Sequence, residues 1–148
     1  MNRIVRLIAV GLLFAVTTPA SADPGAMPAA AQAAKPMRVV VQVSENDPKV
    51  WNLALNNARN AQKDVGAANI EIEVVAFGPG LGMLRDDSLV ANRVEEAQAA
   101  GVHFVACRNT MQAQHLTEAE MIAGIGYAQA GVIEIIKRQM EGFAYLRP

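Results

Sequence analysis

Three stretches of the chain are almost continuously apolar over the length of a β-strand. They span Met37–Val43, residues 70–77 and residues 102–106. Runs of this length, rich in Val and Ile and little interrupted by polar residues, are typical of parallel strands that are covered on both faces. A shorter run at 143–146 indicates a last strand, and residues 122–127 are ambiguous between a helix end and a strand. We therefore predict a sheet of about five strands.

The segments between these runs carry apolar residues at the spacing of amphipathic helices. The first helix begins at Asp47, an N-cap residue followed by Pro48, and Gly66 ends it. Ser88 caps a second helix, and a third begins at Gly131. The residues expected to face the sheet are Val50, Leu53, Ala54, Ala58, Ala61 and Val65 in the first helix, Leu89, Val90, Val94 and Ala97 in the second, and Val132, Ile133, Ile135, Ile136 and Met140 in the third.

Shorter signals complete the alternation of strand and helix. Residues 80–84 and 109–114 favour short helices, and Thr117 with Glu120 forms a capping box. The alternation predicts an α/β fold, namely a three-layer α/β/α sandwich with a mostly parallel sheet. In such sheets, ligands and reacting groups gather at the carboxyl ends of the strands.

The first 22 residues have the pattern of a secretory signal peptide. Arg3 and Arg6 precede an apolar run at 7–16, and Ala20-Ser21-Ala22 provides small residues for cleavage. About ten apolar residues are too few for a transmembrane helix, which needs roughly 20. We predict a signal peptide over 1–22, a flexible Ala- and Pro-rich arm over 23–36 and a domain over 37–148. The expected location is periplasmic or secreted, with no membrane attachment after cleavage.

The net charge of the chain limits the classes of molecule that it is expected to bind. Removing residues 1–22 takes away Arg3 and Arg6 but no acidic residue, which leaves 11 Lys and Arg against 14 Asp and Glu, a net charge of −3. The sequence shows no basic stripe and no basic face studded with aromatic residues. Binding to nucleic acid is therefore not expected.

The loops that follow the three long strands carry the candidate binding residues. They are Asn46, Asp47, Trp51 and Asn52 after the first strand, Gly78, Pro79 and Gly80 after the second, and Arg108, Asn109 and Thr110 after the third. The glycine-rich turn at 78–82 lacks the Lys and Ser or Thr of a phosphate-binding loop, so a tight turn is the favoured interpretation. For Trp51, a position in the core or in a subunit contact is favoured over a pocket wall.

Cys107 ends the third strand and is the single cysteine of the chain. At a junction between strand and helix it lies near unpaired backbone N–H groups, which favour the thiolate. Two interpretations stay open, because many free cysteines are simply small, buried hydrophobic residues. An unpaired cysteine in an exported protein is unusual, however, and it is explained by burial, by pairing between subunits or by a reactive thiol.

Neither histidine assists this cysteine. His103 lies four residues earlier on the same strand, about 13 Å away at the rise of a β-strand. His115 follows eight residues later and is similarly remote. Activation of Cys107 then depends on the helix N-terminus, on Arg108 or on a group brought in by folding. No cluster of His, Cys, Asp and Glu has the spacing of metal ligands, so we expect no metal and no cofactor.

Several segments together resemble the DsrE/DsrF-like proteins, and in particular their exported, small-domain branch. The matching segments are 39–44, 51–58, 77–81, 104–110 and 142–148. The resemblance covers nearly all of residues 37–148 and implies the DsrE/DsrF-like α/β fold. Family members with known roles are sulfur-relay proteins in which a cysteine at this junction carries a persulfide. Cys107 is the residue here that matches this position, and the resemblance also implies a trimer or a hexamer.

Two functions of different classes follow. The first is an exported carrier of sulfur, as a persulfide, or of a thiol, acting through Cys107; it is at most a sulfurtransferase-like enzyme and exchanges sulfur with a donor or acceptor protein. The second is a non-catalytic oligomeric module that binds a small ligand or a protein beside Trp51 and the 78–82 turn. For the carrier we expect Cys107 to be partly exposed and to have a lowered thiol pKa.

Overall fold

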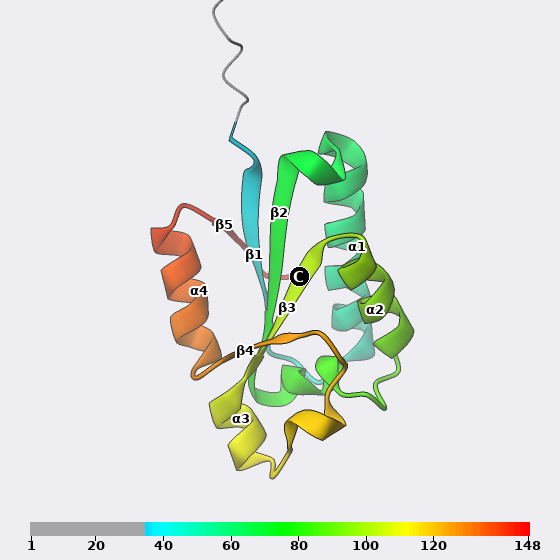
Figure 1. Cartoon of the computed structure of the whole chain (residues 1–148), viewed down its shortest axis with the longest axis vertical. Helices are drawn as coiled ribbons and strands as arrows, with labels where there is room; N and C mark the ends of the chain where they lie inside the picture. Colours follow the sequence, from blue (N-terminus) through cyan, green and yellow to red (C-terminus); the bar gives the residue numbers. More distant parts are fainter. Residues whose placement is uncertain (1–34) are drawn as a thin grey trace, which may run out of the picture. The chain divides into compact units, whose positions relative to one another are not determined.

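The computed structural model describes residues 35–148, and the predicted signal peptide and residues 23–34 of the predicted arm lie outside this range. The described residues form one five-stranded sheet with the order β4-β3-β2-β1-β5, in which every strand pairing is parallel (Figure 1). The strands are β1 (Met37–Val43), β2 (Ile70–Ala76), β3 (Val102–Cys107), β4 (Gly126–Ala128) and β5 (Ala144–Leu146). The prediction of about five mostly parallel strands is confirmed.

The three long strands form the centre of the sheet and the two short strands form its edges. β1 pairs with β2 over its whole length, from Met37 opposite Ile70 to Val43 opposite Ala76. β4 and β5 contribute three residues each. Short edge strands leave few unpaired backbone groups, which limits pairing with other chains. The ambiguous region at 122–127 is a loop over residues 122–125, and its last two residues begin the short strand β4.

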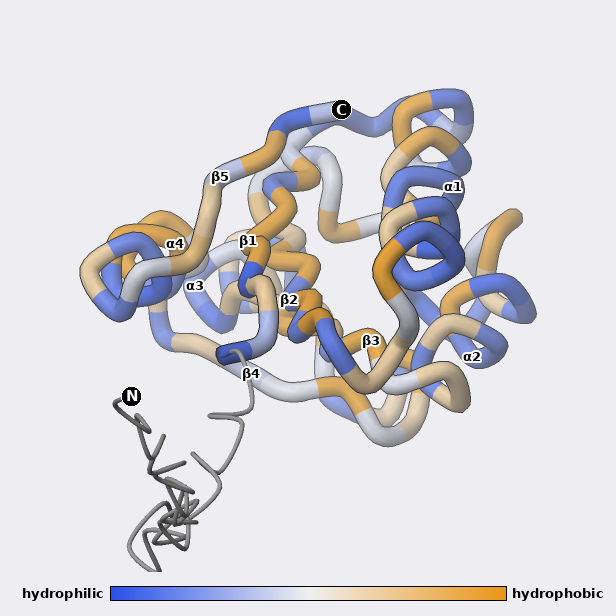
Figure 2. The backbone as a smooth tube through the Cα atoms, turned by 90° about the horizontal axis from the view of Figure 1, so that it is seen from above, coloured by the Kyte–Doolittle hydropathy of each residue, from blue (hydrophilic) through white to orange (hydrophobic). Residues whose placement is uncertain are grey.

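Helices cover both faces of the sheet. The helices α1 (Pro48–Val65) and α2 (Ala91–Ala99) lie on one face, and α4 (Gly131–Met140) lies on the other (Figures 1 and 2). The larger apolar core fills the space under α1 and α2. A smaller cluster lies under α4 and consists of Val40, Val75, Val105, Ile135 and Phe143. The predicted three-layer α/β/α sandwich is thus confirmed.

The beginning of α1 follows the sequence prediction, but its buried face is rotated from the predicted one. The Asp47 side chain caps the helix by accepting a hydrogen bond of 2.8 Å from the backbone N–H of Lys49. The buried residues of α1 are Trp51, Ala54, Leu55 and Ala58. Leu53 was expected to face the sheet and is instead exposed. The large indole of Trp51 faces the sheet in its place, so Leu53 lies on the outer side.

The second helix begins later than expected. The sequence placed a cap at Ser88, whereas α2 begins at Ala91 and its N-cap residue is Val90. Ser88 instead forms a turn in which its carbonyl oxygen accepts from the Ala91 N–H at 3.0 Å. Because Leu89 belongs to this turn, its side chain is 84% exposed, and the prediction that it faces the sheet is wrong.

The short helices and the last strand lie close to their predicted positions. The glycine-rich turn forms the 3₁₀ helix η2 (Gly78–Leu84), and the helix expected at 109–114 is α3 (Arg108–Ala113). The capping box of Thr117 and Glu120 is confirmed at the 3₁₀ helix η3 (Glu118–Glu120). Two further elements, the 3₁₀ helix η1 (Ala67–Asn69) and β5, complete the chain, and Phe143 packs in the core just before β5.

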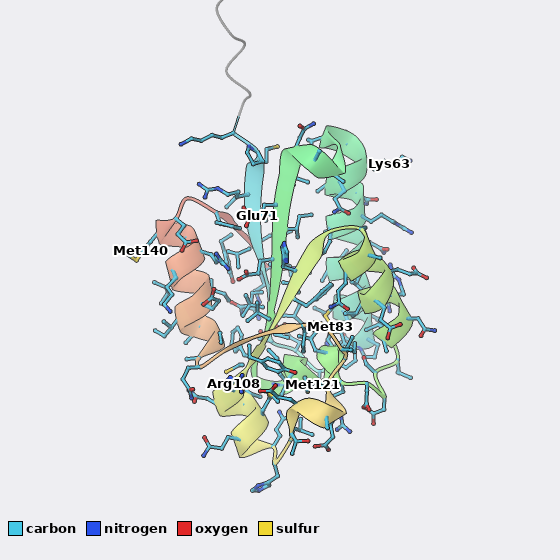
Figure 3. The ribbon with its side chains drawn as sticks, in the orientation of Figure 1. Lys63, Glu71, Met83, Arg108, Met121 and Met140 are labelled. Carbon is cyan, nitrogen blue, oxygen red and sulfur yellow. The ribbon has the colours of Figure 1, made fainter. Side chains whose placement is uncertain are left out.

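The apolar face of α4 is largely uncovered. Of the five apolar residues expected to face the sheet, only Ile135 is buried. The exposed ones are Val132, Ile133, Ile136 and Met140, at 46–84% exposure. Figure 3 shows Met140 pointing away from the sheet at the end of the helix. These residues are exposed because α4 is the one helix packed over this face within residues 35–148, and nothing in that range covers its outer side.

One ion pair anchors α4 to the sheet. Glu73 of β2 is 4% exposed, and Arg138 binds both of its oxygens, at 3.0 Å through Nε and at 2.7 Å through a terminal nitrogen. Glu134 and Glu141 also contact Arg138, at 3.2 and 3.0 Å. These carboxylates raise the pKa of Arg138, chiefly through the hydrogen bond that Arg138 donates to Glu73. The pair therefore fixes the position of α4 on a partly polar sheet face.

Candidate functional site

The three loops at the carboxyl ends of β1, β2 and β3 meet through direct contacts. The N–H of Phe77 donates to the carbonyl oxygen of Val43 at 3.1 Å, which joins the ends of β2 and β1. The N–H of Gly78 donates to the Thr110 hydroxyl oxygen at 2.9 Å, which joins the ends of β2 and β3. Gly80 packs so closely that a Cβ there would lie 2.4 Å from the Val43 oxygen. Glycine at this position therefore permits the loops to meet.

Cys107 is the last residue of β3 and the N-cap residue of α3. Its side chain is only 5% exposed, so our expectation of a partly exposed thiol is wrong for the single chain. The beginning of α4 covers the thiol, because a Cβ on Gly131 would lie 3.3 Å from Cβ of Cys107 and 3.0 Å from Cβ of Phe77. The thiol is therefore held under backbone.

Hydrogen-bond donors surround the Cys107 sulfur. Burial alone raises the pKa of this thiol, but the Thr110 hydroxyl and the backbone N–H groups of Gly131, Thr110 and Asn109 lie toward the sulfur, so the net effect is a lowered pKa. The Asn109 N–H is shared with the Gln129 carbonyl oxygen. Two of these N–H groups belong to the first turn of α3 and one to the first residue of α4. Donors at helix N-termini stabilise the thiolate because they point at it and carry partial positive charge.

The Thr110 hydroxyl is oriented so that it can stabilise the Cys107 thiolate. Its oxygen accepts the hydrogen bond from Gly78, so its own hydrogen is free to point to the sulfur of Cys107. Gly78 has a positive φ of 54°, a conformation that glycine adopts without strain. The glycine-rich turn thus contributes to the site by positioning a threonine side chain.

Gln129 closes the site from the side of β4. Its carbonyl oxygen accepts from the Asn109 N–H at 3.1 Å and lies 3.9 Å from the Cys107 sulfur, toward which the thiol donates. Its side-chain amide donates to Oδ1 of Asn109 at 2.7 Å. Sequence reasoning missed both Gln129 and Gly131, which lie more than 20 residues beyond Cys107 and belong to no recognisable motif.

Arg108 contacts groups other than the sulfur. Its guanidinium pairs with Glu118 at 2.6 Å and lies over the Tyr127 ring, 4.7 Å from the ring centre. Burial, with a further contribution from Glu118, raises the pKa of Tyr127. The donors around Cys107 therefore come from backbone and from Thr110, whereas the nearby arginine stabilises the loop at 117–120.

Comparison with known proteins identifies the family to which this fold belongs. The model of the DsrE/DsrF-like family matches residues 37–148. The chain belongs to the DsrE/DsrF-like family. A comparison with curated proteins gives no match.

Solved structures share the DsrE/DsrF-like fold. MTH1491 of Methanobacterium thermoautotrophicum, a protein of unknown function, is 38% identical, with a TM-score of 0.72 over 76% of this chain and 99% of that one. The ychN protein of E. coli is 12% identical, with a TM-score of 0.61 over 77% and 99% of the two chains. BT1422 of Bacteroides thetaiotaomicron, also of unknown function, is 14% identical, with a TM-score of 0.57 over 75% and 94%. The last two support the fold alone.

The remaining candidate residues of this DsrE/DsrF-like chain have structural contacts. Trp51 is 5% exposed, and its indole N–H donates to the Glu45 carbonyl at 2.8 Å. The Asn52 amide donates to the Pro48 carbonyl at 2.7 Å, and its oxygen accepts from Arg93. Asp47 is the N-cap of α1, Asn46 lies in the same loop, and Pro79 occupies the first turn of η2. These contacts place Trp51 in the core and leave its indole unavailable to a ligand.

Within residues 35–148, no three His, Cys, Asp or Glu side chains are close enough together to hold a metal ion. In the same range, no helix combines the length and the apolar character needed to cross a membrane.

Proposed function

We propose that this DsrE/DsrF-like protein carries sulfur as a persulfide on Cys107. The observation that carries the proposal is the position of Cys107 as the N-cap residue of α3 and against the first residue of α4, where nearby donors lower the thiol pKa despite burial. The sulfur-relay roles known for members of the family support the same chemistry. Cys107 lies at a junction between strand and helix, and the family resemblance implies that this is the position of the persulfide cysteine.

Loading and discharge are both exchanges at a sulfane sulfur. The Cys107 thiolate attacks the outer sulfur of a donor persulfide or polysulfide, a new S–S bond forms, and the S–S bond of the donor breaks. The donor leaves as a thiolate, so no external oxidant or reductant is needed. In discharge, an acceptor thiolate attacks the outer sulfur and Cys107 leaves as a thiolate. Donors that stabilise this thiolate therefore assist both steps.

The lack of a second cysteine suits a carrier. A persulfide on Cys107 has no thiol in its own chain with which to form a disulfide, because the sequence contains a single cysteine. The sulfur therefore waits for an external acceptor. Burial of the thiol limits further oxidation during this wait, which matters in the periplasmic or secreted location that we propose from residues 1–22.

We also propose that the protein is a homo-oligomer, a trimer or a hexamer, and that a second copy covers α4. Val132, Ile133, Ile136 and Met140 are exposed along one helix, and a row of this kind favours burial between subunits. By sedimentation we expect Ile136→Lys to dissociate the assembly. Leu89→Lys, which changes an exposed apolar residue outside α4, should leave it intact. A wild-type protein that is monomeric at micromolar concentration would contradict this proposal.

The carrier function is tested by mass analysis. Wild type and Cys107→Ser, purified without reductant, are incubated with a polysulfide donor. Wild type should gain the mass of one sulfur atom per chain, and Cys107→Ser should gain none. Incubation with a low-molecular-weight thiol should then return wild type to its original mass. Failure of the wild type to take up sulfur would rule out the carrier function.

A further inference from the structure

We propose that the side chains of Asn109 and Gln129 form a clasp that holds segment 129–131 closed over Cys107. Opening of the clasp admits the sulfur donor and the acceptor. The clasp consists of the 2.7 Å hydrogen bond from the Gln129 amide to Oδ1 of Asn109, next to the 3.1 Å backbone hydrogen bond between the same residues. The proposal rests on the carrier function and adds how access to the sulfur is controlled.

The closed form leaves little access to the sulfur. Cys107 is 5% exposed, and the backbone of Gly131 packs against both Cys107 and Phe77 so tightly that a Cβ would press on them. Exchange at a persulfide requires an acceptor thiolate to reach the outer sulfur, opposite the bond that breaks. Movement of the segment therefore controls how readily a donor or an acceptor reaches the sulfur.

The surroundings of segment 129–131 permit this movement. The last residue pair between β3 and β4 is Cys107 opposite Ala128, so the strand ladder ends one residue before Gln129. The side chains of Asn109 and Gln129 are exposed, and water can replace their mutual hydrogen bond.

Open space lies on both sides of Gln129. One groove of about 430 Å³ is lined by Arg108, Gln112 and Glu118 together with Gln129. A second groove of about 420 Å³ includes Gln129, Tyr127 and Ile133. Gly131 begins α4, and the Ala130 carbonyl oxygen accepts from the N–H groups of Ile133 and Glu134 at 3.1 Å, so the movement carries the first turn of α4 outward into this space.

Loading with sulfur favours the open form. The Cys107 thiol donates to the Gln129 carbonyl at a long distance of 3.9 Å, whereas the other groups around the sulfur donate to it. In a persulfide the inner sulfur has no hydrogen, so this contact is lost. The added outer sulfur needs space beside the Cys107 sulfur, and outward movement of segment 129–131, which carries both the Gln129 carbonyl and the Gly131 N–H, provides it. The loaded protein is therefore more open than the empty one.

The test is the rate at which an alkylating agent modifies Cys107, measured across pH in Asn109→Ala, Gln129→Ala and the double variant. Removing one hydrogen bond between exposed side chains should raise the plateau rate at high pH about fivefold. The double variant should be no faster than either single one, because both remove the same interaction. The pH midpoint should not move, since the closed form remains the major form and neither substitution removes a group that donates to the sulfur.

Gln112→Ala is the matched control, because Gln112 lines the same groove without taking part in the clasp. It should react at the wild-type rate. Plateau rates in the clasp variants equal to that of wild type would overturn the clasp, whether or not the protein takes up sulfur. Faster alkylation in a protein that never takes up sulfur would keep the clasp and refute the carrier function. Hydrogen exchange at 129–131 should also be faster in the loaded protein, and unchanged exchange would refute the effect of loading.

Discussion

Replacing Thr110 by Val tests the electrostatics of the site directly. Valine has nearly the shape of threonine but lacks the hydroxyl that accepts from Gly78 at 2.9 Å and donates to the sulfur of Cys107. A hydrogen bond to a charged group contributes about 1.5 kcal/mol, so its loss should lower the thiolate fraction roughly tenfold at a pH below the pKa. The Gly78 N–H also loses its partner, and the fold should lose about 1 kcal/mol.

The assay is the pH dependence of alkylation of Cys107, with urea unfolding in parallel. Thr110→Val should move the midpoint of the profile to higher pH and leave the plateau rate unchanged. Thr110→Ser keeps the hydroxyl and should stay close to wild type, which separates the hydrogen bond from the lost methyl group.

Two results would refute this reasoning. A Thr110→Val profile that superimposes on that of wild type would mean that the hydroxyl does not stabilise the thiolate. A Thr110→Ser profile displaced as far as that of valine would assign the effect to packing. The clasp variants change the plateau and this variant changes the midpoint, so one experiment distinguishes access from ionisation.

Three further predictions concern stability and are measured by urea unfolding. Gly80→Ala should lower the free energy of unfolding by about 2–3 kcal/mol, because its Cβ would meet the backbone oxygen at the end of β1. Gly126→Ala has ordinary contacts and should lower it by less than about 1 kcal/mol, so equal losses would be evidence against the close approach at Gly80. Glu73→Ala should cost about 2–3 kcal/mol by leaving Arg138 without its buried partner, and a neutral effect would mean that water reaches this pair. The pKa of Cys107 is lower in the folded chain than in the unfolded chain, so ionisation of the thiol stabilises the fold. This stabilisation is complete at a pH above the pKa of the unfolded chain and is lost as the pH falls through the pKa of the folded chain. The stability of wild type relative to Cys107→Ser should therefore increase as the pH is raised toward about 8.5, and a pH-independent difference would contradict the lowered pKa.

Strands and their order of alternation were predictable because buried parallel strands leave a continuous apolar signal. Met37–Val43 was located to the residue, and Cys107 was placed correctly at the end of β3. These features depend on local sequence, since a run of β-branched residues has few alternatives to a covered strand.

Helix faces were less predictable because they depend on where the helix begins and on what covers it. Leu89 is apolar and correctly spaced, but the helix begins after it. In α4 the spacing predicted an apolar face correctly, yet the sheet covers only Ile135. Periodicity identifies an apolar side of a helix but not the partner that buries it.

The surroundings of the cysteine were the least predictable part. The donors from Asn109 and Thr110 follow from the junction between strand and helix, which the sequence indicates. Gly131 and Gln129 reach the sulfur only because the chain crosses back over the sheet after β4. Their residue types are ordinary for a loop and a helix start, so only the folded chain identifies them.

The strand order has a consequence for how the chain folds. Residues 37–107 form the three central strands with α1 and α2, and each of these strands pairs with the next one along the chain, whereas β5 pairs with β1 from the opposite end of the domain and closes a much longer loop. The edge strands β4 and β5 belong to the last part of the chain and lie at opposite edges, with α4 spanning between them. We therefore expect the central unit to form first and the segment from 126 onward to dock afterwards. Cys107 gains its cover and its Gly131 donor only at that second stage, so pulse alkylation during refolding should find the thiol accessible until the last phase. Protection in the first phase would exclude this order of assembly.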